Sequence, residues 1–223
     1  MKVSLIIPTR NEEGCIGKVL QEVPREYINE IIVVDGHSTD NTAKEAKANL
    51  NSKDKFILQK GKGYGGAFLE GFDIASGDVI IMMDGDGSHN PAEIPALIDK
   101  ISRGYEYVMA TRFMPGGKSD DNALIRWIGN RIFTWLTNVI HGTSVTDSLY
   151  LFSAITREGL QKLNLKSKGF EFCSEIIVKA HRAGLKFAEI PAFERKRYSG
   201  KAKTNAIWHG YKILKEILKR YKD

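Results

Sequence analysis

The sequence predicts an α/β fold in which helices flank a mostly parallel central sheet, and three observations support this. Short runs of β-branched and other apolar residues recur along the first half of the chain, with helical patterns between them. The runs are continuously apolar, which is typical of strands buried on both faces of a parallel sheet. Polar or glycine-rich clusters follow most of them. Regular alternation of strand and helix favours βαβ units.

In the first half, strands are expected at 3–7, 31–34, 55–59, 79–83 and 107–110, and helices at about 15–22, from about 42, at about 65–75 and at 91–102. Asp40 or Thr39 could cap the second of these helices. The second half has a different pattern: a helix at 122–140, a strand segment at 146–155, a helix at 169–183, a short strand at 186–191, a basic loop at 195–203 and a terminal helix at 205–222. No repeat or linker divides the chain, which predicts one domain over residues 1–223.

The terminal helix is expected to be amphipathic. It places five apolar residues on one face, and its lysines lie mainly elsewhere: Ile207, Tyr211, Leu214, Leu218 and Tyr221. Such a face packs on the helix's own domain or, when the helix is basic, lies in a membrane interface. Sequence alone leaves both open, and the same holds for the aromatic residues of the 122–140 helix.

The charge balance narrows the classes of partner. The chain has 223 residues, with 33 Lys and Arg against 27 Asp and Glu, a net charge of +6. The excess is concentrated in residues 194–223, which is compatible with phosphorylated substrates, an anionic membrane or nucleic acid. Nucleic acid is not expected, because Tyr198 is the only aromatic residue in the basic loop that could stack on bases.

Other features bear on location. No apolar stretch approaches the ~18 residues of a transmembrane helix, and the N-terminus lacks a signal-peptide layout. The two cysteines, Cys15 and Cys173, form neither a disulfide framework nor a four-cysteine zinc site. The cytosol is therefore the expected location.

A pair of carboxylates, Asp84 and Asp86, follows the strand at 79–83. Such a pair can hold Mg²⁺, which often binds proteins through one or two carboxylates together with substrate phosphates. The alternative is an ordinary turn, since Asp and Gly often end strands. Ser88 and His89 are close enough in sequence to contribute, and His89 is expected at the surface rather than as a ligand.

Three further segments have both a binding and a structural interpretation. Asp35, at the end of the 31–34 strand, either accepts a hydrogen bond from a base or ribose or only shapes the turn. The run at 61–66 matches G-x-G-x-x-G, but it follows the third strand rather than the first, which excludes dinucleotide binding. Its glycines either admit a ligand beside Lys62 or form a tight turn. The loop at 195–203 either grips a phosphate through arginine forks or is solvated.

Taken in order, these motifs resemble the family-2 glycosyltransferases, which have the GT-A fold. Segments 6–12 and 33–42 resemble the opening and the nucleotide-binding turn of that family, and Asp84-Gly85-Asp86 occupies the place of its metal-binding motif. Further segments narrow the resemblance to the polyprenyl-phosphate glycosyltransferases, the dolichol-phosphate mannose synthase branch: 112–117, Arg126 with Gly129-Asn130, Asp147, 169–172, 189–191 and 195–203. The resemblance covers nearly the whole chain.

The resemblance implies a set of site residues and a division of the chain. The nucleotide pocket would be lined by Pro8, Arg10, Glu12, Asp35, Lys62 and Asp84. Mg²⁺ or Mn²⁺ would bind at Asp84 and Asp86, with Ser88 where many relatives have a glutamine ligand. The diphosphate or the lipid phosphate would be faced by Arg112, Arg126, Arg195, Arg197 and Lys203. Residues 1–115 would then form the nucleotide-sugar half and 116–223 the acceptor half.

The sequence departs from the family pattern at two places. Gly36 follows Asp35 where the common turn has two adjacent aspartates, which bears on nucleobase recognition. Leu151-Phe152-Ser153 stands where many relatives have Gly-Phe-Arg, which bears on the sugar and the acceptor. A UDP-sugar is the favoured donor, and GDP-mannose is the alternative.

The expected reaction is an inverting, metal-dependent transfer of one sugar from a nucleotide diphosphate sugar to a polyprenyl or dolichyl phosphate. A phosphate acceptor is largely a dianion at neutral pH and needs no strong general base. The alternative is transfer to a sugar hydroxyl, with Asp147, Glu171 or Glu175 as base, and a further one is a nucleotide-sugar-binding protein without catalysis. The protein is expected at the cytoplasmic face of a membrane as a peripheral protein, docked by its terminal helix or by a membrane partner protein.

Overall fold

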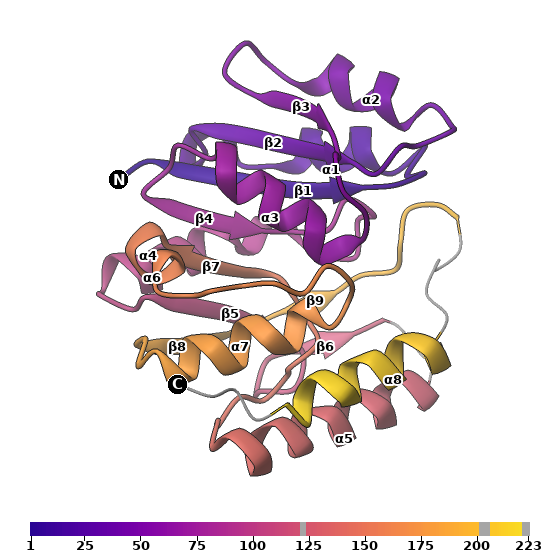
Figure 1. Cartoon of the computed structure of the whole chain (residues 1–223). Coiled ribbons are helices and arrows are strands. Elements are labelled where there is room, and N and C mark those ends of the chain that lie inside the picture. Colours follow the sequence, from indigo (N-terminus) through magenta and orange to yellow (C-terminus); the bar gives the residue numbers. More distant parts are fainter. Residues whose placement is uncertain (121–123, 201–205, 220–223) are drawn as a thin grey trace.

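The computed structural model describes residues 1–120, 124–200 and 206–219. One seven-stranded sheet forms its centre (Figure 1). The strands lie in the order β3 (Lys55–Leu58), β2 (Glu30–Asp35), β1 (Val3–Thr9), β4 (Val79–Met82), β7 (Ser153–Thr156), β5 (Tyr107–Thr111) and β8 (Phe187–Pro191). All neighbouring pairs are parallel except the two made by β7. The prediction of a mostly parallel sheet is confirmed.

Helices cover both faces of the sheet. A separate hydrophobic cluster lies between each face and the helices that cover it. One face carries α1 (Ile16–Glu22), α2 (Thr42–Asn49) and α4 (Ile94–Ser102), and the other carries α3 (Tyr64–Ile74), α6 (Arg157–Gln161) and α7 (Phe172–Arg182). Single 3₁₀ turns, η1 (Arg25–Tyr27) and η2 (Pro91–Glu93), precede β2 and α4. Because the central strands are buried on both faces, they are apolar at successive positions.

The strand expected at 146–155 is shorter than predicted. Only Ser153–Thr156 forms a strand, β7, and it is antiparallel to both neighbours. Backbone N–H groups before β7 donate to side chains rather than to a neighbouring strand. The N–H of Thr146 donates to Glu189 Oε1 at 2.8 Å, and the N–H of Ser148 donates to Thr134 Oγ1 at 3.0 Å. The segment is therefore held in an irregular conformation beside the ends of the strands.

Two short elements were not anticipated. β6 (Lys118–Ser119) and β9 (Phe193–Glu194) form a two-stranded parallel pair outside the main sheet. This pair joins the chain after β5 to the chain after β8. It therefore brings the segment that begins at Arg195 back toward the edge where the strands end.

The helices α5 (Leu124–His141) and α8 (Ala206–Ile217) lie side by side outside the sheet (Figure 1). His141 Nε2 is 2.7 Å from the carbonyl oxygen of Ile217 and ties the two helices together. α5 buries Thr134 and Thr137 and leaves its apolar stripe exposed: Leu124, Ile128, Ile132, Trp135 and Val139. In a helix that only packs on its own domain, the apolar stripe faces inward, so α5 has the opposite arrangement.

The terminal helix is amphipathic as predicted, but its packing face differs from the predicted one. α8 buries Ile213 and Ile217, whereas Tyr211 and Leu218 of the predicted face are exposed. Tyr221 and the side chain of Ile207 lie outside the described residues. Among the described residues, no helix has both the length and the apolar character required for crossing a membrane.

Candidate active site

The acidic turn 84–89 directly follows β4, at the edge where the parallel strands end. Tyr64 at the start of α3 donates its hydroxyl hydrogen to Asp84 Oδ1 at 2.6 Å, and the Asp84 N–H donates to His89 Nδ1 at 3.0 Å. Asp86 Oδ1 accepts the N–H of Ser88 at 2.9 Å. Desolvation, and then the neighbouring charge of Asp86, raise the pKa of Asp84 to about 7. Both carboxylates are thus held in one short turn, with positions fixed by hydrogen bonds.

His89 was expected at the surface, and this expectation is wrong. The side chain is buried, and its ring stacks on Phe152 and meets the ring of Tyr150 edge-on. Burial lowers the pKa of His89 to about 4, so the imidazole is neutral at pH 7 and its Nδ1 can accept the Asp84 N–H. His89 therefore positions the acidic turn, a role that sequence reasoning missed because Phe152 lies far along the chain.

The ends of β1 and β2 form the neighbouring part of the site. Asp35 is buried and accepts hydrogen bonds from the Ser38 N–H at 3.0 Å and from the Ser38 and Thr9 hydroxyls. These bonds support the turn-shaping interpretation of Asp35. Pro8 pairs with Val34 at the same edge.

The glycine run before α3 forms a tight turn, and Lys62 within it is exposed. Gly63 has a φ of 90°, and a Cβ at this position would overlap the carbonyl oxygen of Lys168. The glycine is therefore required by the close approach of the chain at 167–169. This observation supports the structural interpretation of the run.

Residues 195–199 return to the acidic turn from the far end of the sequence. Arg195 donates from Nε to the carbonyl oxygen of Gly87 at 3.1 Å and from Nη2 to that of His89 at 3.0 Å. The Tyr198 N–H donates to the carbonyl oxygen of Asp86 at 3.1 Å. Arg195 thus holds the backbone of the turn in place.

Arg197 lies between two predicted ligand residues. Its Nη1 is 2.6 Å from Asp86 Oδ2, and its Nη2 is 2.6 Å from Glu12 Oε2. Lys203, predicted for the same site, lies outside the described residues. The structure therefore brings the predicted acidic residues Asp86 and Glu12 into contact with the predicted basic residue Arg197.

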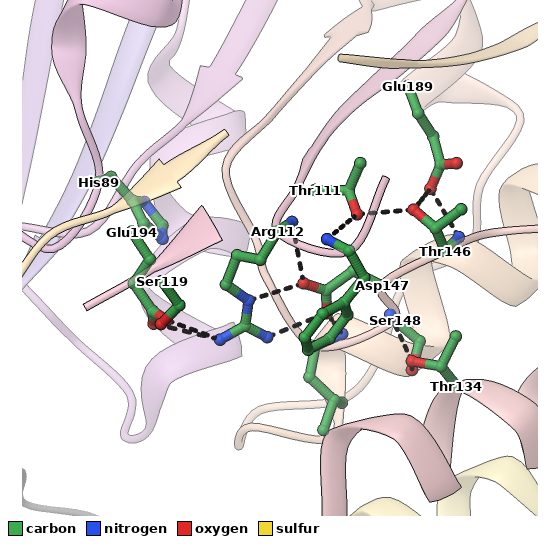
Figure 2. Close-up of polar contacts among 12 residues, drawn as sticks. His89, Thr111, Arg112, Ser119, Thr134, Thr146, Asp147, Ser148, Glu189 and Glu194 are labelled. Carbon is green, nitrogen blue, oxygen red and sulfur yellow. Dashed lines mark hydrogen bonds and ion pairs between the residues drawn. The ribbon is translucent and has the colours of Figure 1, made fainter. Parts of the chain in front are cut away.

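Arg112 lies at the centre of a buried polar network (Figure 2). Its Nε is 2.7 Å from Asp147 Oδ2, its Nη2 is 3.0 Å from Asp147 Oδ1, and its Nη1 is 3.1 Å from Glu194. The guanidinium also lies 4.9 Å from the ring centre of Tyr150. Burial alone would lower the pKa of Arg112, but Asp147 and Glu194 raise it. Each nitrogen of the guanidinium thus faces a carboxylate, and the Asp147 side chain is itself fully buried.

Two further predicted basic residues are exposed. Arg10 directly follows β1, with its Cβ beside Gly36, which follows β2, and Arg126 is in the first turn of α5. Arg126 therefore lies at the margin of the apolar stripe rather than in the acidic turn.

The three carboxylates considered as general bases differ in their surroundings. Asp147 is occupied by Arg112. Glu175 accepts the N–H groups of Lys166 and Ser167 and pairs with Lys179. Glu171 Oε1 accepts the Gly169 N–H at 3.2 Å, and Glu171 Oε2 has no hydrogen-bond partner within the described part of the chain. Counting only contacts among the described residues, Glu171 is the one of the three with an oxygen that accepts no hydrogen bond.

Comparison with known proteins identifies the family. The family model of glycosyl transferase family 2 matches residues 4–163. The chain belongs to this family. It is a glycosyltransferase of the hexosyltransferase type, as the sequence predicted.

Two relatives illustrate what the chain is similar to within family 2. It is 31% identical to the dolichol-phosphate mannosyltransferase of Pyrococcus furiosus over 96% of this chain and 64% of the relative. It is 30% identical to the UDP-N-acetylglucosamine–dolichyl-phosphate N-acetylglucosaminyltransferase of Methanococcus voltae over 97% of this chain and 94% of the relative. Both names agree with the branch that the motifs resemble.

A solved structure matches the fold. Glucosyl-3-phosphoglycerate synthase from Mycobacterium tuberculosis, crystallised with Mn²⁺, UDP and glucosyl-3-phosphoglycerate, superposes with a TM-score of 0.79 at 19% identity, covering 97% of this chain and 78% of that one. The fold of this family-2 chain is the predicted GT-A fold.

The acidic turn of the family-2 chain fits a divalent cation. Asp86 Oδ2 already binds a positive group, the guanidinium of Arg197, and Asp84 lies two residues away. Within the described residues, no three His, Cys, Asp or Glu side chains gather as a metal cage. Such a sparse donor set suits Mg²⁺, which takes one or two carboxylates and completes its shell with water and phosphate oxygens.

Proposed function

We propose that this glycosyltransferase transfers one sugar, with inversion, from a nucleotide diphosphate sugar to a polyprenyl or dolichyl phosphate, with Mg²⁺ or Mn²⁺ as cofactor. The observation that carries the proposal is the meeting of the acidic turn with the basic segment 195–199 at the carboxyl edge of the sheet. Ligands bind at this edge in open α/β sheets. The names of the two relatives support the lipid-phosphate acceptor.

The donor belongs at the acidic turn in this proposal. Asp86 and Asp84, with Ser88 beside them, would hold the cation, which when bound would neutralise charge on the departing diphosphate. Pro8, Arg10, Glu12, Asp35 and Lys62 would surround the nucleotide. Residues 1–115 then serve the donor and 116–223 the acceptor. A UDP-sugar is the favoured donor, and the structural neighbour that binds UDP supports it.

The acceptor phosphate needs positive charge rather than a base. Its second pKa is near ~6, so it is largely a dianion at pH 7 and already a nucleophile. Catalysis then rests on positioning and charge neutralisation. Arg195, Arg197 and Lys203 are assigned to the phosphate. Arg112, which follows β5, and Arg126, in α5, are assigned to the diphosphate or the lipid phosphate. Arg195 is also the residue that fixes the turn, since it binds the carbonyl oxygens of Gly87 and His89.

An enzyme with a lipid acceptor needs a surface that binds the membrane. The helices α5 and α8 together provide such a surface. The exposed stripe of α5 consists of large apolar side chains, with Trp135 62% and Val139 63% exposed. α8 adds exposed Trp208 and Tyr211. A helix with an exposed apolar face lies in the interface plane of a bilayer.

The positive charge around the stripe favours an anionic bilayer as the surface that the stripe contacts. α5 carries Arg126 and Arg131 and no acidic residue. In α8, Lys212 and Lys215 accompany the exposed aromatic residues, and Glu216 is buried against Lys219. Basic residues near an anionic surface each contribute about 1 kcal/mol to binding. We therefore place the protein peripherally on the cytoplasmic face of a membrane.

The test is a partition assay. The full chain is incubated with Mn²⁺ or Mg²⁺, a short polyprenyl phosphate, and labelled UDP-glucose, UDP-N-acetylglucosamine or GDP-mannose in turn. Label that moves into the organic phase with one donor, and stays in the aqueous phase with EDTA, supports the proposal and names the sugar. Metal-dependent nucleotide binding with no organic label from any donor would contradict the lipid-phosphate acceptor.

Transfer to a sugar hydroxyl is the second candidate, and the uncommitted Oε2 of Glu171 favours it. A hydroxyl acceptor needs a base in reach of its proton. Under this alternative, Glu171→Gln would lower kcat by about a hundredfold. Under the lipid-phosphate proposal, Glu171→Gln leaves kcat within about threefold, because no proton has to be removed. Transfer measured in the same partition assay separates the two.

A further inference from the structure

The guanidinium of Arg197 spans the carboxylates of Asp86 and Glu12. In the proposed function Asp86 binds the cation and Glu12 lies beside the nucleotide. Both contacts are 2.6 Å long. The Arg197 side chain is 21% exposed, Asp86 17% and Glu12 12%, so the three groups are mostly shielded from water. Shielding strengthens ion pairs relative to those at an open surface.

We propose that Arg197 is an internal competitor of the divalent cation: in the donor-free protein its guanidinium occupies Asp86 Oδ2, and cation binding displaces it. This inference rests on the proposed function, because it concerns the metal site of that reaction. Asp86 Oδ2 is 2.6 Å from Arg197 Nη1, which leaves no room for a metal ion on the shared side of that oxygen. Two positive groups would also repel each other there.

The charge of the site explains why such a group is needed. Asp86 and Glu12 lie on two sides of one guanidinium where β1 and β4 end, and Asp84 is two residues from Asp86. Without a cation, like charges at this spacing destabilise each other. The Arg197 guanidinium neutralises part of this charge until a metal ion arrives.

The backbone around Arg197 is held by other contacts, so the Arg197 side chain can move without it. Arg195 is held by carbonyl oxygens of the turn and by Glu22, and the Tyr198 backbone is held by Asp86 O. These contacts do not involve the Arg197 side chain. The Arg197 side chain itself donates from Nε to the carbonyl oxygen of Ser199 at 3.2 Å and pairs with Glu12. Displacement by the cation therefore requires a change of rotamer that gives up these contacts as well as Asp86, while the backbone stays in place. The freed guanidinium can then turn to the phosphate groups that it is proposed to bind.

The experiment measures Mn²⁺ binding to the full chain without nucleotide, by the loss of the free Mn²⁺ paramagnetic resonance signal. Arg197→Gln removes the competitor, so we expect its Kd for Mn²⁺ to fall about tenfold, which corresponds to about 1.4 kcal/mol. Lys196→Gln is the matched control, because it removes the same charge from an exposed neighbour. Its Kd should stay within about twofold of the parent value.

Arg197→Lys provides a second variant if Arg197→Gln does not fold. An ammonium group cannot span both carboxylates as a planar guanidinium does, so the Kd should fall by about threefold. Unchanged or weaker Mn²⁺ binding in either variant overturns the proposal, as does an equal gain in Lys196→Gln. Sugar transfer is measured separately. If the parent protein makes no lipid-linked sugar, the proposed function fails while the Mn²⁺ affinities still decide this inference.

Discussion

Arg112 and Asp147 form a two-point ion pair in the interior of the protein, with Nε 2.7 Å from Oδ2 and Nη2 3.0 Å from Oδ1. Arg112 directly follows β5, and Asp147 belongs to the irregular segment before β7. On its other side the guanidinium binds Glu194 of β9, and Ser148, next to Asp147, is bound to Thr134 of α5 (Figure 2). The pair therefore joins the end of a central strand to α5 and to the segment that carries Arg195 and Arg197.

Asp147→Asn is expected to destabilise the protein strongly. It keeps the shape of the side chain but removes the charge that faces Arg112, and breaking one side of a buried ion pair costs about 3 kcal/mol or more. The free energy of unfolding from a urea titration measures the effect. The control is Asp99→Asn, which breaks the exposed Asp99–Arg103 pair and should cost at most about 0.5 kcal/mol. Equal losses in the two variants would contradict a structural role for the buried pair.

Asp86→Asn is expected to nearly abolish sugar transfer. The loss of a cation ligand removes several kcal/mol of charge stabilisation from the departing diphosphate, so kcat should fall about 1000-fold. Label partition at saturating Mn²⁺ measures it, with circular dichroism to verify the fold. Asp73→Asn, on the exposed side of α3, is the control and should keep parent activity. Full activity in Asp86→Asn would exclude the metal assignment.

The sequence predicted the strands well, because a continuous apolar run is a local signal of a strand buried on both faces. The segment 146–152 was predicted as strand for the same reason, since it too contains apolar residues. Its conformation depends on Thr134 and Glu189, which lie 14 and 43 residues from their partners. Hydrogen bonds over such separations leave no local pattern in a single sequence.

The site was partly predictable for a similar reason. Asp35 is the last residue of β2, and Asp84 and Asp86 closely follow β4, so topology alone places them at one edge. The motif-based expectation that Arg112 faces a phosphate did not include its partners Asp147 and Glu194, which are 35 and 82 residues away. The burial of His89 likewise depends on Phe152, a tertiary contact that no spacing reveals.

The stability of the protein is expected to depend on Glu30 at acidic pH. Burial alone would raise the pKa of Glu30, but Lys55, Ser4 and Ser76 outweigh it and lower the pKa to about 2. Because the folded pKa lies below the unfolded value of about 4.3, the ionised form stabilises the fold above that pH. This stabilisation is lost as the pH falls toward 2.

Glu30→Gln tests this dependence. At pH 7 the variant should lose about 2 to 3 kcal/mol of unfolding free energy relative to the parent. The difference should shrink between pH 4.5 and 2, where the parent carboxylate becomes protonated. Glu26→Gln, at an exposed position, serves as the control and should change stability by less than about 0.5 kcal/mol at any pH. A difference that does not vary with pH would mean that the charge of Glu30 is not what stabilises β2.

Membrane binding should depend on the outward apolar stripe of α5, to which Trp135 belongs. Replacing Trp135, which is 62% exposed, by Gln removes an aromatic side chain from the bilayer contact without disturbing the core. Partitioning onto vesicles with anionic lipid should fall about tenfold. Leu58→Gln is the matched control, since Leu58 is 57% exposed but lies on the edge strand β3, and its binding should stay at the parent level. Raising the salt concentration should weaken the binding of parent and variants alike, because Lys212 and Lys215 contribute through charge.

Equal losses from Trp135→Gln and Leu58→Gln, or parent protein that does not sediment with vesicles, would contradict docking through α5 and would point to a membrane partner protein instead.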